Sequence, residues 1–150
     1  MRREHYRLFS ACRIGSLALP NRLVRSATWD PVLLGPRQVI PEVVDLYRRQ
    51  AGGGVGLIIT GGLPVYRERL PDEQGPAAYD YDDLRVAGIE RLAAAVHGAG
   101  AGCRVVAQLE TGYLPAGPSE RISPWDGRPI RALAVSEIAR IVDSFVAAIV

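Results

Sequence analysis

The feature that most constrains this chain is a short apolar run between two groups of glycines. Residues 52–54 are all glycine, residues 55–60 form the run, and Gly61 and Gly62 follow it. An unbroken apolar run of this length is typical of a strand that is buried on both faces. Such strands belong to parallel sheets, so the run predicts a sheet of the α/β class.

A helix and an earlier strand are predicted before this run. Pro41 stands where a first-turn proline is tolerated, and Glu42 suits the positive end of a helix. Apolar side chains then recur at three- and four-residue spacing: Val43, Leu46, Tyr47 and Ala51. Residues 23–28 mix β-branched and apolar side chains, which predicts a strand, and residues 14–19 could form a hairpin before it. Residues 23–60 therefore predict one strand–helix–strand unit.

The same alternation continues along the chain. Residues 63–81 are rich in Pro, Gly and charged residues and predict a loop. Asp82 and Asp83 can cap a second helix, and residues 103–109 predict a third strand. The apolar stripe of the second helix comprises Leu84, Gly88, Leu92, Ala95, Val96 and Ala99. Strands and helices thus continue to alternate.

A second long loop and a third helix complete the chain. Residues 112–131 contain four prolines and predict the loop, and Ser136 and Glu137 begin the helix. The apolar face of this helix comprises Ile138, Ile141, Val142, Phe145 and Ile149. Three strands that alternate with helices predict a parallel α/β sheet, although periodicity does not separate a barrel from an open sheet. No fourth strand follows the third helix within these 150 residues.

Composition excludes several classes of protein. Eighteen basic residues stand against sixteen acidic ones, and the basic residues are scattered, so nothing predicts a nucleic-acid or membrane-surface protein. We find no signal-peptide core and no apolar run of about 18 residues, and we expect a cytoplasmic location. Cys12 and Cys103 have no metal-binding spacing, and we expect Cys103 to be a buried, reduced thiol.

Four motifs resemble the start of the Old Yellow Enzyme family of FMN-dependent NADH:flavin oxidoreductases. They are LFS at residues 8–10, IG at 14–15, NRLVRSATWD at 21–30 and GGGVGLIITGG at 52–62. The resemblance implies a (β/α)8 TIM barrel, which typically needs about 250 residues. It therefore implies that residues 1–150 are the N-terminal part of such a barrel, about three βα units, with no second domain.

The resemblance also implies a cofactor site at the carboxyl ends of the strands. Thr28 occupies the position where the family places a Thr or Cys beside flavin O4, and Ala27 would lie against the flavin ring. Gly61 and Gly62 follow a buried strand, where a missing side chain lets a planar ring approach the backbone. Gln108 offers a donor and an acceptor, which suit the N3–H and O2 edge of the flavin pyrimidine.

Each of these residues also has a plain structural interpretation. Thr28 could satisfy its own backbone at a strand end, and a glycine pair is common where a strand enters a loop. Gln108 could simply mark the point where an apolar strand meets water. His97 lies on the second predicted helix, away from the strand ends, so packing or capping is its better interpretation.

The sequence departs from the family pattern after Gln108. Many members continue with Gln-Leu-x-His-x-Gly-Arg, whereas this chain reads QLETGY at residues 108–113, with no histidine or arginine. The family's substrate-binding pair, proton-donating tyrosine and phosphate site come from later strands. We therefore assign no catalytic residue to this chain.

The resemblance implies both a function and a cofactor, FMN, whose affinity for this chain can be estimated. The resemblance implies hydride transfer from NAD(P)H through FMN to a small-molecule substrate, an activated alkene or related acceptor. A few hydrogen bonds contribute roughly 0.5–1.5 kcal/mol each, whereas micromolar affinity needs about 8 kcal/mol. We therefore expect weak or absent FMN binding by this chain alone.

Two alternatives have different functions. The chain could be a non-catalytic truncated half-barrel, or an interaction module that self-associates or needs a complementing chain, because the predicted sheet has open edges. A flavodoxin-like module is less favoured. It needs a phosphate loop after its first strand, and WDPV at residues 29–32 is neither glycine-rich nor hydroxyl-rich.

Overall fold

The computed structural model describes residues 6–28, 41–65, 83–100, 102–111, 116–124 and 127–149. The chain divides into two compact units. The first unit comprises Met1–Leu63 and Tyr81–Gln108, and the second comprises Pro64–Asp80 and Leu109–Val150. In the described part of the chain, no helix combines the length and the apolar character that a membrane crossing requires.

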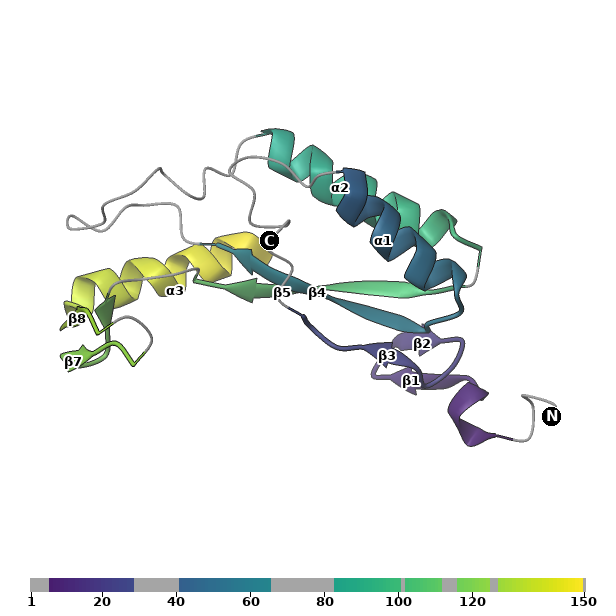
Figure 1. Ribbon diagram of the computed structural model, residues 1–150, viewed down its shortest axis with the longest axis horizontal. Helices are drawn as coiled ribbons and strands as arrows, with labels where there is room; N and C mark the ends of the chain where they lie inside the picture. Colours follow the sequence, from purple (N-terminus) through teal and green to yellow (C-terminus); the bar gives the residue numbers. More distant parts are fainter. Residues whose placement is uncertain are drawn as a thin grey trace. The chain divides into compact units, whose positions relative to one another are not determined.

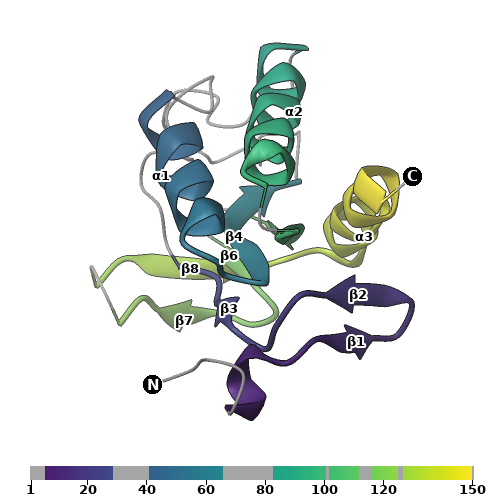
Figure 2. The same ribbon diagram turned by 90° about the vertical axis from the view of Figure 1, so that its right-hand side faces the viewer.

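The first unit begins with the predicted hairpin. After a 3-10 turn at Arg7–Phe9 (η2), β1 (Cys12–Ile14) pairs antiparallel with β2 (Leu17–Leu19) (Figure 2). Gly15 lies in the turn with a φ of 57°, in the left-handed region that glycine adopts at little cost. The prediction of a hairpin over residues 14–19 is confirmed, and its first strand begins two residues earlier.

A three-stranded sheet follows, in the order β3-β4-β5. The strands are β3 (Val24–Arg25), β4 (Leu57–Pro64) and β5 (Arg104–Glu110). β3 pairs parallel with β4, and the arrows of β4 and β5 point the same way in Figure 1. The predicted α/β class is therefore confirmed, and the described strands form part of a barrel wall rather than a closed barrel.

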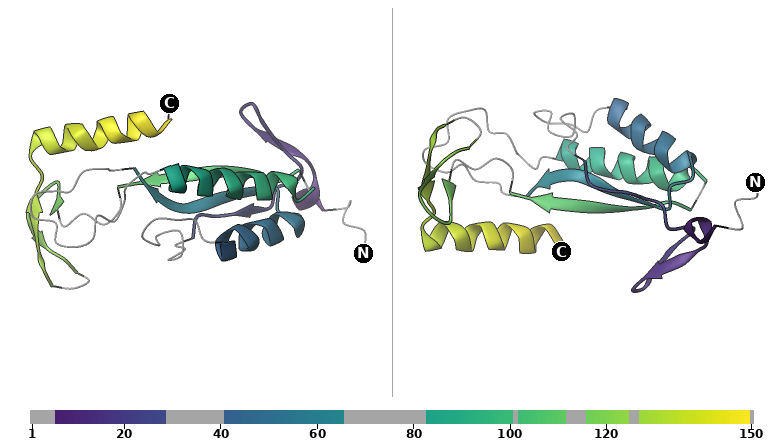
Figure 3. Two further views of the ribbon diagram at one scale, coloured as in Figure 1. Left: turned by 90° about the horizontal axis from the view of Figure 1, so that it is seen from above. Right: turned by 60° about the horizontal axis from the view of Figure 1, so that its bottom comes forward.

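Two helices connect these strands. α1 (Pro41–Gly52) begins at the predicted proline and ends among the predicted glycines, and α2 spans Asp83–Gly98. Both helices lie against the same face of the sheet (Figures 1 and 3). The core between helices and sheet comprises Val43, Tyr47, Ala51, Ile58, Leu92, Val96 and Cys103.

The two faces of the sheet differ in burial. Ile58 faces the helices and is fully buried, and its neighbour Leu57 is also only 5% exposed, which confirms a strand that is buried on both sides at this point. On the face opposite the helices, Val24 is 47% exposed and Val106 is 42% exposed. This open face is the one that would line the interior of a barrel.

Strand boundaries differ from the predictions in three places. The first predicted strand, residues 23–28, is reduced to Val24–Arg25, and the second, residues 55–60, becomes Leu57–Pro64. Gly61 and Gly62 therefore lie inside β4 rather than after it, and the predicted loop begins later than residue 63. The predicted helix start at Asp82 and most of the loop 63–81 fall outside the described residues.

The second unit contains short strands where a loop was predicted. β6 (Ala116–Gly117) pairs parallel with β8 (Pro129–Ala132), and β7 (Arg121–Ile122) pairs antiparallel with β8. The prediction of a loop through residues 112–131 is therefore wrong in part. Pairs this short leave almost no periodicity, because a two-residue strand cannot show alternation.

α3 (Val135–Ile149) follows, close to the predicted start. In the small core described for the second unit, Leu133 and Ile141 pack against Ala116. Much of the predicted apolar face remains exposed: Ile138 is 41%, Val142 53% and Ile149 74% exposed.

Candidate functional site

The carboxyl ends of β3, β4 and β5 bring together the five residues that the sequence singled out. Ala27 and Thr28 follow β3, Gly61 and Gly62 lie in the second half of β4, and Gln108 lies near the end of β5. All five belong to the first unit, so they share one compact body. The site can therefore be described without reference to the second unit.

Gln108 is an exposed polar residue of the site. It lies two residues after Val106 along β5, so both side chains are on the open face of the sheet. Its backbone N–H donates to the Thr60 hydroxyl at 3.0 Å. Among the described residues, the Gln108 side-chain amide makes no hydrogen bond, which leaves its donor and acceptor available to a ligand.

Thr28 is exposed and has a local hydrogen bond. Its Oγ1 donates to the Ser26 carbonyl at 3.2 Å, which is the backbone contact that the plain structural interpretation predicts. A hydroxyl has one hydrogen to donate, and a flavin carbonyl needs a donor. Thr28 could therefore meet a flavin carbonyl only after its O–H turned away from Ser26. Ala27 beside it is also exposed.

Gly61 and Gly62 differ in burial and in their backbone contacts. Gly61 is buried and Gly62 is half-buried. The Gly61 N–H donates to the Tyr47 hydroxyl at 3.1 Å, and the Gly61 carbonyl accepts from the Thr60 hydroxyl at 2.7 Å. Side chains therefore hold both polar groups of Gly61.

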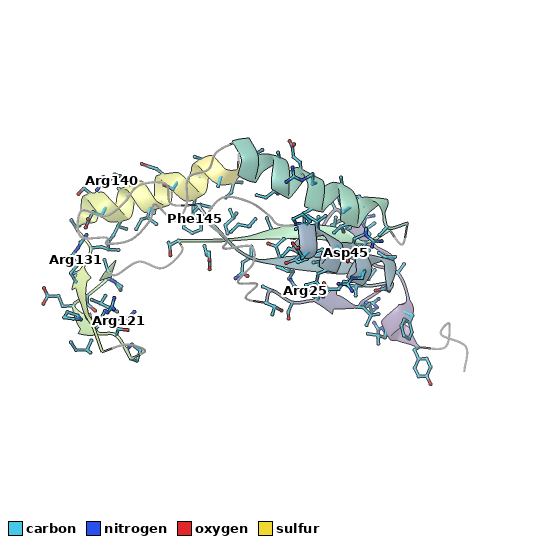
Figure 4. All side chains as sticks on the ribbon, turned by 45° about the horizontal axis from the view of Figure 1, so that its top comes forward. Arg25, Asp45, Arg121, Arg131, Arg140 and Phe145 are labelled. Carbon is cyan, nitrogen blue, oxygen red and sulfur yellow. The ribbon has the colours of Figure 1, made fainter. Side chains whose placement is uncertain are left out.

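Arg25 and Tyr47 are site-supporting residues that sequence reasoning missed. The Arg25 guanidinium donates through Nη1 to the Tyr47 hydroxyl at 2.8 Å and to the Ile59 carbonyl at 3.0 Å. It also lies over the Tyr47 ring, 4.7 Å from the centroid (Arg25 is labelled in Figure 4). A cation inside a predicted strand was the available signal for Arg25. Tyr47 was indistinguishable from an ordinary core residue.

Asn21 fixes the start of the same sheet. Its Nδ2 donates to the Gly54 carbonyl at 2.8 Å, and its Oδ1 accepts from the Leu23 N–H at 2.9 Å. A Cβ on Gly56 would lie only 2.6 Å from Asn21 Oδ1, so a larger residue at this position would require Asn21 to shift. Asn21 therefore ties the entry of β3 to the turn that precedes β4.

In the described part of the first unit, the titratable groups with displaced pKa values lie away from the carboxyl ends of β3, β4 and β5. Asp45, on α1, accepts from Arg48 at 2.6 Å, and this hydrogen bond lowers the pKa of its carboxyl group. Burial raises the pKa of the Cys103 thiol, and both cysteines are free, as predicted for Cys103. His97 is exposed in the last turn of α2, at the end of the helix that precedes β5.

An ion pair joins Arg131 to Glu137 in the second unit. The Arg131 guanidinium donates two hydrogen bonds of 2.8 Å to the Glu137 carboxylate (Arg131 is labelled in Figure 4). Glu137 Oε2 also accepts from the Ala134 N–H at 2.8 Å. The Arg131 hydrogen bonds, followed by the Ala134 one, lower the pKa of Glu137 to about 2. Glu137 therefore caps the first turn of α3.

Comparison with known proteins supports the resemblance to the Old Yellow Enzyme family. A "Metal reductase" of Desulforamulus reducens is 36% identical over 92% of the chain, and an "NADH oxidase" of Thermoanaerobacter brockii is 32% identical over 95%. The solved structure of the old yellow enzyme homologue from Zymomonas mobilis matches 92% of the chain with a TM-score of 0.66 and 25% identity. No protein-family profile matches.

Coverage of these relatives is partial. The chain spans 21% of the metal reductase, 23% of the NADH oxidase and 42% of the Zymomonas structure. The similarity therefore covers only part of each of these proteins.

Proposed function

We propose that this chain forms part of the flavin site of an FMN-dependent oxidoreductase of the Old Yellow Enzyme type. The observation that carries the proposal is the Gln108 amide, exposed on the open face at the carboxyl end of β5, beside the glycine pair of β4. Similarity to an NADH oxidase supports the same conclusion. When bound, FMN supplies the hydride chemistry, with NAD(P)H as reductant and an activated alkene or related small molecule as acceptor.

The residues present fit one edge of a flavin. Gln108 can donate to O2 and accept from N3–H, because its amide carries both functions. The glycine pair at this end of β4 has no side chains to prevent a planar ring from approaching the backbone, and Gly62 is only half-buried. Ala27 is small and exposed, which suits contact with the ring, and Thr28 would contribute a donor after its hydroxyl reorients.

The fit predicts weak binding by the chain alone. Three or four such hydrogen bonds contribute roughly 2–6 kcal/mol together, at about 0.5–1.5 kcal/mol each. Millimolar affinity corresponds to about 4 kcal/mol. We therefore expect a dissociation constant for FMN in the millimolar range, within reach of nuclear magnetic resonance.

An FMN titration of the ¹⁵N-labelled chain tests the proposal. The amide signals of Ala27, Thr28, Gly61, Gly62 and Gln108 should shift together as FMN approaches millimolar concentration. Gln108→Ala should weaken binding severalfold, because it removes both hydrogen bonds to the pyrimidine edge.

A matched control lies on the same strand. Arg104 is exposed on the same face of β5 but at its amino end, so Arg104→Ala should leave the Gly62 shifts unchanged. Failure of these five amides to shift at millimolar FMN would overturn the proposal.

A second candidate function is an interaction module that needs a complementing chain. The observation in its favour is the exposed apolar face of α3, where Val142 and Val146 are 53% and 57% exposed. The same titration separates the candidates, because an interaction module predicts no FMN shifts at the strand ends.

A further inference from the structure

We propose that Thr60 is a positioning residue for the flavin site, acting through the backbone of Gly61 and Gln108. The proposal deepens the function proposed above and rests on it. It starts from the pairing of β3 with β4, which ends at Arg25 and Ile58. After that pair, the Ile59 carbonyl and the Gly61 N–H of β4 form hydrogen bonds to side chains.

On the β3 side, two side chains hold the end of β4. Arg25 Nη1 donates to the Ile59 carbonyl, and the Tyr47 hydroxyl accepts from the Gly61 N–H. Tyr47 is fully buried in the core between α1 and the sheet. The amide of Gly61 is thus anchored to a residue that cannot move without disturbing the core.

On the β5 side, the Thr60 hydroxyl makes the connection. Its oxygen accepts from the Gln108 N–H at 3.0 Å, and its hydrogen is donated to the Gly61 carbonyl at 2.7 Å. Thr60 is 4% exposed, so water does not compete freely for these two bonds. One hydroxyl therefore joins the backbone of β5 at Gln108 to the backbone of β4 at Gly61.

This connection fixes the groups that would meet the flavin. The Gly61 carbonyl and the Gly62 N–H belong to one planar trans peptide and point in opposite directions. Holding the carbonyl therefore sets the direction of the Gly62 N–H. Holding the Gln108 N–H likewise sets the point from which the Gln108 side chain leaves β5.

A purely structural role makes a different prediction. If Thr60 only stabilised the sheet, any variant of equal stability would bind FMN equally well. If Thr60 positions the site, removal of its hydroxyl should change binding while the protein remains folded.

The experiment compares Thr60→Val with Thr60→Ser in the full 150-residue chain. Thr60→Val keeps the side-chain shape but removes the hydroxyl, and it should weaken FMN binding about three- to tenfold, the equivalent of one hydrogen bond. Thr60→Ser retains the hydroxyl and should restore binding to within about twofold. Thr60→Ala also removes the hydroxyl and has a smaller side chain, so it replaces Thr60→Val in the experiment if Thr60→Val does not fold.

Hydrogen exchange provides a readout without flavin. In Thr60→Val the Gln108 backbone amide should exchange faster than it does in the wild-type chain. This increase in rate should exceed the increase at the other amides of β5. In Thr60→Ser the Gln108 amide should exchange at the wild-type rate. A uniform increase along β4 and β5 would indicate lost stability alone and would overturn the inference.

Leu92→Val supplies the matched control. Leu92 is buried in the same core, on α2, and has no part in the Thr60 hydrogen bonds. It should lower stability without changing FMN affinity. Equal FMN binding by the wild-type and Thr60→Val chains would overturn the role of Thr60 but not the proposed function. No FMN binding by the wild-type chain would overturn both.

Discussion

The two units of this chain are stabilised in different ways. Among the described residues, the first unit has a core cluster of seven buried residues between two helices and a sheet, with Tyr47 and Ile58 fully buried. The core cluster described for the second unit contains one buried residue, Ala116, with Leu133 and Ile141 packed against it. Its helix α3 starts at the Arg131–Glu137 ion pair and the Ala134 cap. Packing therefore dominates the first unit, and local hydrogen bonds and charge dominate the second.

The difference bears on function. A binding site needs groups held in place by their surroundings, and the five candidate flavin contacts all lie in the well-packed first unit. α3, in contrast, leaves Val142 and Val146 more than half exposed, so its apolar face provides no such packed support.

The largest expected effect compares two isoleucines. Ile58→Ala empties a fully buried position in the first unit and should cost about 2–5 kcal/mol of unfolding free energy. Ile141→Ala makes the same deletion at a half-buried position in the second unit and should cost on the order of 1 kcal/mol. Urea unfolding followed by hydrogen exchange in each unit measures both. Equal losses of unfolding free energy would contradict the conclusion that packing stabilises the first unit more than the second.

An intermediate effect compares two glycines of the first unit. In Gly56→Ala the new Cβ would lie 2.6 Å from Asn21 Oδ1 and 2.8 Å from the Asn21 carbonyl oxygen, and overpacking of this kind costs about 1–3 kcal/mol. Gly52→Ala meets no atom within 4 Å and should change stability by about 0.5 kcal/mol or stabilise the protein. Thermal unfolding of the two variants gives the difference. A harmless Gly56→Ala would show that the entry of β3 is not held by Asn21.

The smallest expected effect concerns acid and the second unit. The pKa of Glu137 falls from its usual 4.5 to about 2 in the folded chain, so its stabilising contribution is complete above about pH 4.5. That contribution is lost as the pH falls toward 2. Between about pH 4.5 and 2, the second unit of Glu137→Gln should therefore lose less stability than the second unit of the wild type. Hydrogen exchange at each pH measures this loss.

Glu120→Gln provides the control for this measurement. Glu120 is an exposed carboxylate of the same unit, and its replacement should leave the pH dependence close to that of the wild type. An identical profile for Glu137→Gln would contradict the stabilising role of the ion pair.

Much of the first unit was predictable from sequence because its signals are local and strong. Pro41 and the glycines after Ala51 mark the ends of α1, and the apolar run after Gly54 marks β4. Gln108 stood out as a polar residue near the end of an apolar strand, and it is exposed at that position. The short strands of residues 116–132 were missed because two-residue pairs carry no periodic signal.

The class of fold, the order of strands and helices in the first unit, and the resemblance to a family could all be predicted from the sequence. The positions of Gly61 and Gly62 inside β4 and the hydrogen bond from Thr28 to Ser26 could be seen only in the folded chain. The tertiary structure also joined Arg25, Tyr47, Thr60 and Gln108, which come from four separate segments, into one hydrogen-bonded support. The physical reason is that propensity and periodicity act between near neighbours, whereas a hydrogen bond between Thr60 and Gln108 exists only after the intervening helix has packed the strands together.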